Sequence, residues 1–185
     1  MKRYKYQYLL FLILIIFIIF FSYIWIQNAR SIYNQVEISM RKIDSSFSEM
    51  LHVHVDKKHT LSFYTTLNNE LVVVSLKRKL IGFKLESYVN KTPLITEKEI
   101  SWQGVSKPNE DIHLLFGTVQ NQDTTQIIIV SERNQSANII RTGSLSFWYL
   151  LTDESVHTPV TIQTFNKDGE KLYETGDLNY WNDKM

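Results

Sequence analysis

The chain has 185 residues, of which 44% are apolar, and this is enough for one or two small domains. The 20 basic and 19 acidic residues give a formal net charge of +1, which argues against a dedicated nucleic-acid-binding protein. The absence of cysteine excludes disulfide scaffolds, thiol nucleophiles, cysteine-ligated metals and a lipidated N-terminal cysteine.

Residues 8–26 form an apolar run without a charged side chain, YLLFLILIIFIIFFSYIWI. As a helix, this run would be about 28 Å long, which matches the hydrocarbon core of a bilayer. The basic tip at 1–7, with Lys2, Arg3 and Lys5, should stay in the cytoplasm and send the rest of the chain across the membrane. A cleaved signal peptide is the alternative, but its apolar core is usually shorter and ends in a small-x-small site. We expect an uncleaved single-pass anchor in the cell membrane, with the C-terminal domain extracytoplasmic.

Residues 27–50 show a helical pattern. Apolar side chains recur at spacings of four and three, which places them on one face of a helix: Val36, Met40, Ile43, Phe47 and Met50. We expect this amphipathic juxtamembrane helix to pack on the sheet that follows. A self-associating stalk is the alternative, although fewer than three heptads are too few to predict a coiled coil.

From residue 51 the pattern alternates with the period of strands that have one buried face. Residues 51–105 are predicted to form an antiparallel β-meander packed on the helix. Its strands are expected at 51–55, 61–67, 71–80 and 81–89, with a short candidate at 99–105. The fold class is therefore an N-terminal transmembrane helix followed by an α+β, mostly antiparallel β ectodomain.

Residues 106–178 are predicted to form a small β-sandwich-like or half-barrel unit, followed by a polar tail at 179–185. Its strands are expected at 113–119, 126–132, 146–151, 160–166 and 170–176. The first two flank a polar turn and are predicted to pair as a hairpin, as are the last two around Lys167-Asp168-Gly169. The dense apolar run SFWYLL at 146–151 predicts a buried central strand.

The best metal candidate is the group His52, His54 and Asp56, because alternate residues of a strand project from one face and could offer nitrogen and oxygen ligands to zinc. The alternative is a solvated strand face, with Leu51, Val53 and Val55 pointing inward. That alternative accounts for all six residues from 51 to 56 together, the three apolar and the three polar ones.

Lys77, Arg78 and Lys79, with Lys84 nearby, are the densest basic run outside the N-terminal tip. Lys77 and Lys79 can share one strand face, and with Lys84 they could bind a polyanion or lipid headgroups. The alternative is that these lysines protect an edge strand against pairing with another chain.

Sequence motifs of catalysis are absent: the chain has no G-x-S-x-G elbow, no phosphate-binding loop and no H-E-x-x-H pair. With 6 glycines in the chain, few backbone positions could approach a phosphate closely. We therefore expect no enzymatic activity and no cofactor.

Three short motifs accompany the N-terminal anchor: an FG-x-V strand, a W-Y strand and a V-T-I…D-G…L-Y hairpin. Their residues are Phe116, Gly117, Val119, Trp148, Tyr149, Val160, Thr161, Ile162, Asp168, Gly169, Leu172 and Tyr173. Over residues 113–175 the chain resembles uncharacterised membrane-anchored or lipoprotein ectodomains of Gram-positive bacteria, although it lacks the lipobox cysteine of the lipoprotein members. The resemblance implies an extracytoplasmic location and carries no functional residues.

Two functions from different classes follow. The first is a non-enzymatic module that sits in the lipid bilayer through residues 8–26 and binds an unknown envelope protein or polymer, but no nucleic acid. The second is an envelope enzyme or metal-dependent hydrolase with a dispersed site. A concave pocket that holds several ionisable groups with perturbed pKa values would favour the second.

Overall fold

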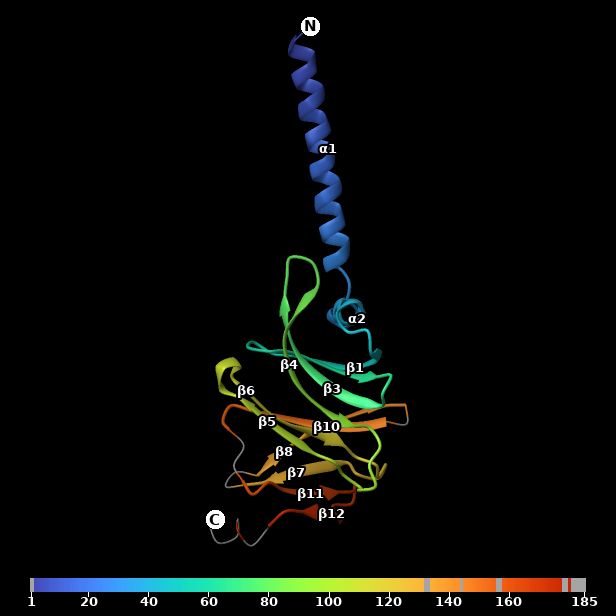
Figure 1. Cartoon of the computed structure of the whole chain (residues 1–185), viewed down its shortest axis with the longest axis vertical. Coiled ribbons are helices and arrows are strands. Elements are labelled where there is room, and N and C mark those ends of the chain that lie inside the picture. Colours follow the sequence, from blue (N-terminus) through green and yellow to red (C-terminus); the bar gives the residue numbers. More distant parts are fainter. Residues whose placement is uncertain (1, 132–133, 144, 156–157, 178–179, 181–185) are drawn as a thin grey trace.

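The computed structural model describes residues 2–131, 134–143, 145–155, 158–177 and 180. The chain begins with a long helix, α1 (Lys2–Asn28), and a short helix, α2 (Ile32–Ile43). The body that follows is a stack of antiparallel sheets, with α2 on top and the C-terminal strands farthest from α1 (Figure 1). The predicted tail at 179–185 lies, apart from Tyr180, outside the described residues.

The body contains three sheets of four strands each. The proximal sheet, next to α2, has the order β1 (Phe47–Val55), β2 (Thr60–Thr66), β3 (Glu70–Arg78), β4 (Phe83–Pro93). The middle sheet has the order β5 (Gln103–Lys107), β6 (Ile112–Thr118), β10 (Leu145–Thr152), β9 (Asn138–Thr142). The distal sheet has the order β12 (Lys171–Thr175), β11 (Thr161–Phe165), β7 (Gln126–Val130), β8 (Gln135–Ser136). A 3₁₀ turn at Pro108–Glu110 joins β5 to β6.

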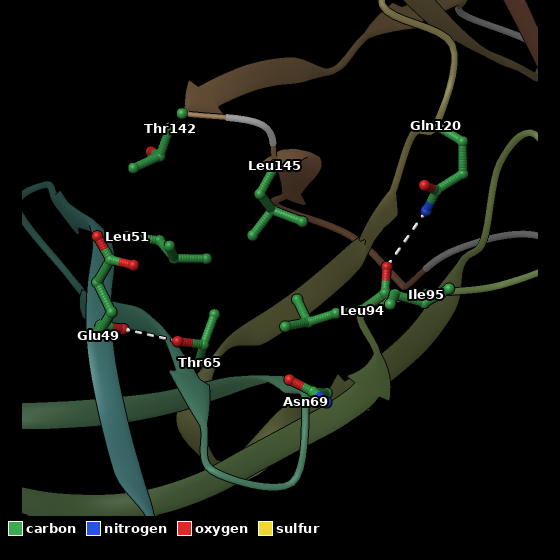
Figure 2. A pocket seen from close by; sticks show the side chains of 10 residues that line it. Glu49, Leu51, Thr65, Asn69, Leu94, Ile95, Gln120, Thr142 and Leu145 are labelled. Carbon is green, nitrogen blue, oxygen red and sulfur yellow. Dashed lines mark hydrogen bonds between the residues drawn. The ribbon is translucent and has the colours of Figure 1, made fainter.

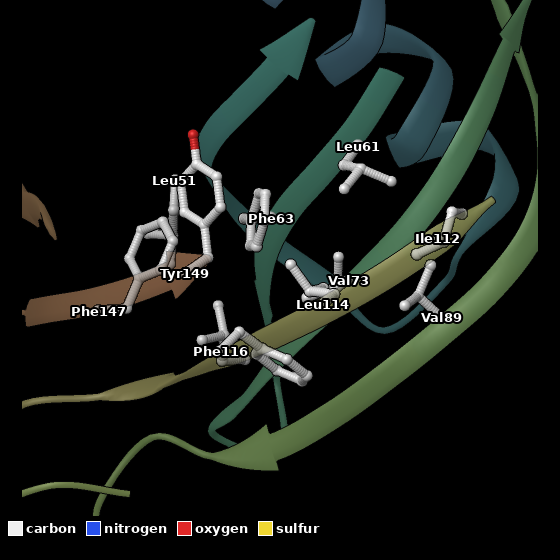
Figure 3. Close-up of a cluster of buried hydrophobic side chains, with 11 residues drawn as sticks. Leu51, Leu61, Phe63, Val73, Val89, Ile112, Leu114, Phe116, Phe147 and Tyr149 are labelled. Atoms are coloured by element: carbon white, nitrogen blue, oxygen red, sulfur yellow. The ribbon is translucent and has the colours of Figure 1, made fainter. Parts of the chain in front are cut away.

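Three apolar clusters hold these layers together. Between α2 and the proximal sheet lie Val36, Met40, Phe47, Met50, Tyr64, Val72, Val74, Leu76 and Phe83. Between the proximal and middle sheets lie Leu51, Leu61, Phe63, Leu71, Val73, Val89, Ile112, Leu114, Phe116, Phe147 and Tyr149 (Figure 3). Between the middle and distal sheets lie Ile100, Leu115, Val119, Ile127, Ile129, Trp148, Leu150 and Ile162. The central strands β2, β3, β6 and β10 are therefore covered on both faces, which is why they read as continuous apolar runs.

The helix α2 is shorter than the predicted span of 27–50. Ser31 caps its N-terminus by accepting a hydrogen bond from the Asn34 amide, and the helix ends at Ile43. Phe47 and Met50 instead belong to β1, where both contact α2. The strand β1 has two register irregularities, Phe47/Glu49 and Met50/His52, and the first returns a residue three positions on to the same face. The spacing of three between Phe47 and Met50, which predicted a helix, is thus produced by a bulge in a strand.

The predicted hairpin of 113–119 with 126–132 is wrong. These segments form β6 and β7, which lie in different sheets: β6 pairs with β5 and β10, and β7 pairs with β8 and β11. The intervening residues therefore cross from the middle to the distal sheet, a separation of about 10 Å that a short loop can span. The boundary predicted between 105 and 106 also falls inside β5.

Other predictions are confirmed. The strands β11 and β12 pair around a turn in which Gly169 has a positive φ of 81°, and β10 is a buried central strand. The meander β1 to β4 has four strands and packs on α2, as expected. The short strands β8 and β9 were not predicted, because their polar residues carry no clear alternation.

Gly117 of β6 shows why one motif residue has no side chain. A Cβ atom built at this position would lie 1.9 Å from the Ser101 carbonyl oxygen. That carbonyl accepts a hydrogen bond from Nε1 of the buried Trp148, at 3.1 Å. The close approach lets the segment before β5 lie over the middle sheet and satisfy the indole.

Candidate functional site

Five titratable side chains gather where β1 and β10 face each other at one side of the stack. We call them the His–Tyr cluster: His52, His54, Asp56, His59 and Tyr149. Together with Lys58, Asn138, Leu151, Thr152 and Asp153, all but His52 line a pocket of about 270 Å³. Strand β1 supplies two of the histidines, the β1–β2 turn supplies Asp56 and His59, and β10 supplies the tyrosine.

The Tyr149 hydroxyl lies between two imidazoles. It is 3.2 Å from Nε2 of His52 and 3.2 Å from Nδ1 of His54, and Nε2 of His54 is 3.1 Å from the Asp56 carboxylate. A carboxylate only accepts, so His54 donates from Nε2 and its Nδ1 accepts the tyrosine proton. The tyrosine oxygen can then accept a proton from His52. One direction of donation therefore satisfies the whole chain of groups, His52 to Tyr149 to His54 to Asp56.

The turn after β1 fixes Asp56. Its Oδ1 accepts hydrogen bonds from the backbone amides of Lys58 and His59, at 2.7 and 2.6 Å. Burial acts to raise the pKa of Asp56, but these bonds, together with the one from His54, outweigh it and lower that pKa below its ordinary value. Asp56 therefore remains an anion that accepts the hydrogen bond from His54 and so orients that ring.

The other groups respond to their surroundings in opposite directions. Burial, followed by the nearby His54, lowers the pKa of His52, and burial raises the pKa of Tyr149. A hydrogen bond and the charge of Asp111 raise the pKa of Lys58, whose Nζ lies 2.7 Å from that carboxylate. His52 and Tyr149 thus favour their neutral forms near neutral pH.

The predicted metal ligands His52, His54 and Asp56 do share one face of β1. That face looks toward the middle sheet and not toward solvent, because the bulge at Met50/His52 turns Leu51 in the same direction. The solvated-face interpretation is therefore wrong: Val55 is 48% exposed while the histidines are partly covered. Within the described residues, no three His, Cys, Asp or Glu side chains are placed to hold a metal ion. Zinc binding stays a prediction without support from the geometry.

One buried atom in this region has no hydrogen-bond partner. The His59 side chain is 8% exposed, its Nε2 lies 3.3 Å from the Glu110 carbonyl oxygen, and its Nδ1 is unpaired, with the Asp56 carboxylate 3.5 Å away. This contact is electrostatic and too long for a good hydrogen bond.

A second pocket opens at the opposite end of β2 and β10. Its volume is about 450 Å³, and it is lined by Glu49, Leu51, Thr65, Asn69, Leu94, Ile95, Gln120, Thr142, Gly143 and Leu145 (Figure 2). Two side-chain hydrogen bonds join described lining residues: the Thr65 hydroxyl donates to the Glu49 carbonyl and the Gln120 amide to the Leu94 carbonyl. A backbone bond from the Leu94 amide to the Asn69 carbonyl also joins two of them. Of the described residues that line it, only Glu49 carries a charge. We call this space the open pocket.

The three predicted polyanion-binding lysines lie on the β3–β4 hairpin. Lys77 on β3 is paired directly with Lys84 on β4, and Lys79 lies in the turn between the strands. Cross-strand pairing thus places Lys77 and Lys84 side by side on one face of the hairpin. Their binding role stays a prediction.

The contact between Tyr149 and the histidines of β1 could not be predicted from sequence, because these residues lie far apart in the chain. Tyr149 was predicted as a core residue, and it is only 4% exposed, but nothing signalled that its hydroxyl meets two histidines 97 and 95 residues earlier. The one available signal was the crowding of His52, His54, Asp56 and His59 within eight positions.

The long helix α1 lies apart from the body. Its segment Leu10–Asn28 is long and apolar enough to cross a membrane, and none of that segment is buried inside the structure. No protein-family model matches the chain, and neither curated proteins nor solved structures show a significant match to it. The resemblance to membrane-anchored ectodomains therefore stays a prediction.

Proposed function

We propose that the protein is a single-pass membrane protein whose β-rich domain lies on the outer side and binds another component of the cell envelope without catalysing a reaction. In this proposal the middle and distal sheets form the sandwich-like unit predicted for the C-terminal part. The binding site in this proposal is the open pocket.

The exposure of α1 carries the membrane part of the proposal. Residues such as Phe11, Phe17 and Ile19 are 62%, 57% and 63% exposed, so the apolar helix finds no cover within its own chain. A stretch of this length and composition is stable in hydrocarbon and not in water. The basic tip supports an orientation with the N-terminus in the cytoplasm.

The open pocket supports the binding part. A volume of about 450 Å³ lies within the range of small-ligand and peptide side-chain sites. Leu51, Leu94 and Leu145 offer apolar contact, and Asn69 and Gln120 offer hydrogen bonds (Figure 2). The only charge among the described lining residues is the carboxylate of Glu49. A neutral or weakly cationic segment of an envelope protein or polymer therefore fits this pocket.

Topology is tested on the full chain in intact cells and in inverted membrane vesicles. We expect added protease to digest the C-terminal domain from the outside only, and the protein to keep its N-terminal tip. Neutralising Lys2, Arg3 and Lys5 to Gln should produce mixed orientations, because the basic bias is then lost. A domain that is protected in intact cells, or released without the apolar helix, would overturn the membrane part.

Partner binding is tested by crosslinking from the rim of the open pocket. Because the chain has no cysteine, Ile95→Cys provides a single attachment point at a side chain that is 79% exposed. We expect a specific crosslinked species that disappears when Thr142→Trp fills the pocket. Val55→Cys, at the opposite end of the sheet, is the matched control. The same species from both cysteines, or its persistence with Thr142→Trp, would contradict binding in this pocket.

A second candidate, an envelope hydrolase, is favoured by one observation. The 270 Å³ pocket holds an aligned Asp56–His54–Tyr149 chain that could move a proton to or from a bound group. Purified full-length protein is assayed against ester, phosphate and glycan substrates. Turnover that His54→Gln abolishes while the fold is retained would favour the hydrolase over the binding module.

A further inference from the structure

The end of the β3–β4 hairpin is a two-stranded ribbon that extends past the rest of the proximal sheet. The partner of β2 nearest to this end is Ser75, so residues 76–85 pair only within the hairpin. We call residues 76–85 the basic ribbon, because the sequence LKRKLIGFKL contains four basic residues and no acid. Its turn is closed by a hydrogen bond from the Lys79 amide to the Gly82 carbonyl.

The four charges of the ribbon have no ion-pair partner among the described residues. Lys77 and Lys84 are direct cross-strand partners, and like charges in this position destabilise a hairpin. Among the described residues, no acidic side chain forms an ion pair with either of them, or with Arg78 or Lys79. An external anion would remove this repulsion.

The ribbon lies beside the end of α1 (Figure 1). The Asn28 side chain donates a hydrogen bond to the Leu80 carbonyl at 3.4 Å. Two further basic residues line the small pocket of about 150 Å³ between the helices and the ribbon, whose lining is Tyr23, Gln27, Arg30, Gln35, Ile38, Ser39, Lys42, Ile81 and Gly82. Leu80, at the tip, is 69% exposed. Basic side chains and one exposed leucine therefore sit at the level where α1 ends.

Specific contacts hold the ribbon in this place. The hydroxyl of Ser39 on α2 accepts a hydrogen bond from the Phe83 amide, and Phe83 is buried against α2. Gln35 donates to the carbonyl of Arg30 at 2.8 Å and to that of Asn28 at 3.4 Å, which ties α2 to the end of α1. The height of the ribbon relative to α1 is thus built into the fold.

We propose that the basic ribbon docks on the headgroups of anionic phospholipids in the bilayer that α1 crosses, with Leu80 inserted between them. The inference rests on the proposed membrane span. The basic side chains would pair with the phosphate charges of the headgroups, and the leucine would contact the upper part of the acyl chains just below them. Protection of open strand edges would account for the lysines alone. It gives no reason for an exposed leucine beside the last turn of α1.

The test reconstitutes the full chain, carrying Leu80→Cys labelled with an environment-sensitive fluorophore, into vesicles of phosphatidylcholine with or without phosphatidylglycerol. We expect a headgroup-attached quencher to act on this probe more strongly when phosphatidylglycerol is present than in phosphatidylcholine alone. Each basic residue near an anionic surface is worth about fivefold in binding. Changing Lys77, Lys79 and Lys84 to Gln should therefore weaken docking on the headgroups by about a hundredfold and remove the additional quenching that phosphatidylglycerol causes.

Two further probes separate this proposal from the one it rests on. Leu67→Cys labels an equally exposed leucine, 71% exposed, in the β2–β3 turn at the opposite end of β3, and it should stay unquenched. Phe17→Cys, in the middle of α1, should report hydrocarbon in every vesicle. A probe at 17 in water would overturn the membrane span itself. A probe at 17 in lipid with equal signals at 80 and 67 would overturn the ribbon proposal alone. Loss of polyphosphate binding in the triple variant without any change in lipid quenching would also overturn it, in favour of a wall polyanion.

Discussion

The interface between the proximal and middle sheets ends in two different ways. At one end, beside the pocket of about 270 Å³, four members of the His–Tyr cluster form a chain of hydrogen bonds from His52 through Tyr149 and His54 to Asp56. At the other end, the open pocket leaves about 450 Å³ between apolar and polar side chains, of which Glu49 alone among the described lining residues carries a charge. Phe63, Phe147 and Tyr149 form the apolar centre between the two ends (Figure 3).

The difference separates an end where hydrogen bonds join the two sheets from an end that has open space between them. Groups that are already paired fix the relative position of the two sheets, since moving them would break several hydrogen bonds together. Groups that line an open space have little to lose when a ligand arrives. The same pair of sheets can therefore be held at one end and offer a binding surface at the other.

The largest effect is expected at the centre that both ends share. Phe63 is fully buried, and its ring centroid lies 5.4 Å from that of Phe147 and 4.7 Å from that of Tyr149. Phe63→Ala should lower the free energy of unfolding by about 3–5 kcal/mol, because it leaves a cavity among aromatic rings. Urea unfolding measures this loss. Leu67→Ala, at an exposed turn position, is the control and should change stability by no more than about 0.5 kcal/mol. Similar values for the two variants would contradict a shared centre.

A smaller loss is expected from the clustered end. Tyr149→Phe keeps the ring and removes the hydroxyl that meets His52 and His54, so it should cost about 1–2 kcal/mol. Thermal unfolding measures the effect, with Tyr88→Phe at a half-exposed tyrosine as the control. If both variants have the melting temperature of the parent protein, the Tyr149 hydroxyl does not stabilise the fold. The proposed difference between the two ends would then be contradicted.

The clustered end should also respond to acid. Because the folded-state pKa of Asp56 lies below the unfolded value of about 3.9, its stabilisation is complete above about pH 4 and is lost as the pH falls toward the folded-state pKa. The carboxylate is partly exposed, so solvent screening limits the effect to about 1 kcal/mol or less. Asp56→Asn keeps an acceptor for the turn amides and should flatten the dependence of the urea midpoint between neutral and acid pH. An unchanged slope would contradict this role.

The smallest effect is expected at the open pocket. The Glu49 carboxylate is exposed, and it is the backbone carbonyl of this residue that receives the Thr65 hydrogen bond. Glu49→Ala should therefore change the free energy of unfolding by no more than about 0.5 kcal/mol. Chemical denaturation of this variant beside Tyr149→Phe compares the two ends directly. A loss as large as that of Tyr149→Phe would show that Glu49 also holds the sheets together.

The long and strongly patterned elements were predictable from sequence. The apolar helix and the run 146–151 need cover on every side, so their place in a membrane-length helix or in a buried strand follows from composition. The turn at Gly169 was predictable because glycine there follows two polar residues between alternating strands.

Pairing between distant segments was not predictable in the same way. The segments at 113–119 and 126–132 carry equal apolar signals, and nothing in either says which sheet it joins. The inward face of β1 was also hidden, because the proximal sheet is covered on both faces and its bulges shift the alternation. The His–Tyr cluster depends on both facts, which is why the sequence showed its histidines without their tyrosine.

Only residues 29–31 separate the two helices, and Gln35 bonds across that short link. In the proposed membrane topology, this short link keeps the body close to the bilayer surface, so a partner would have to come within the thickness of its three stacked sheets. Inserting residues into this link would test that limit, because the body could then reach partners that lie farther from the membrane.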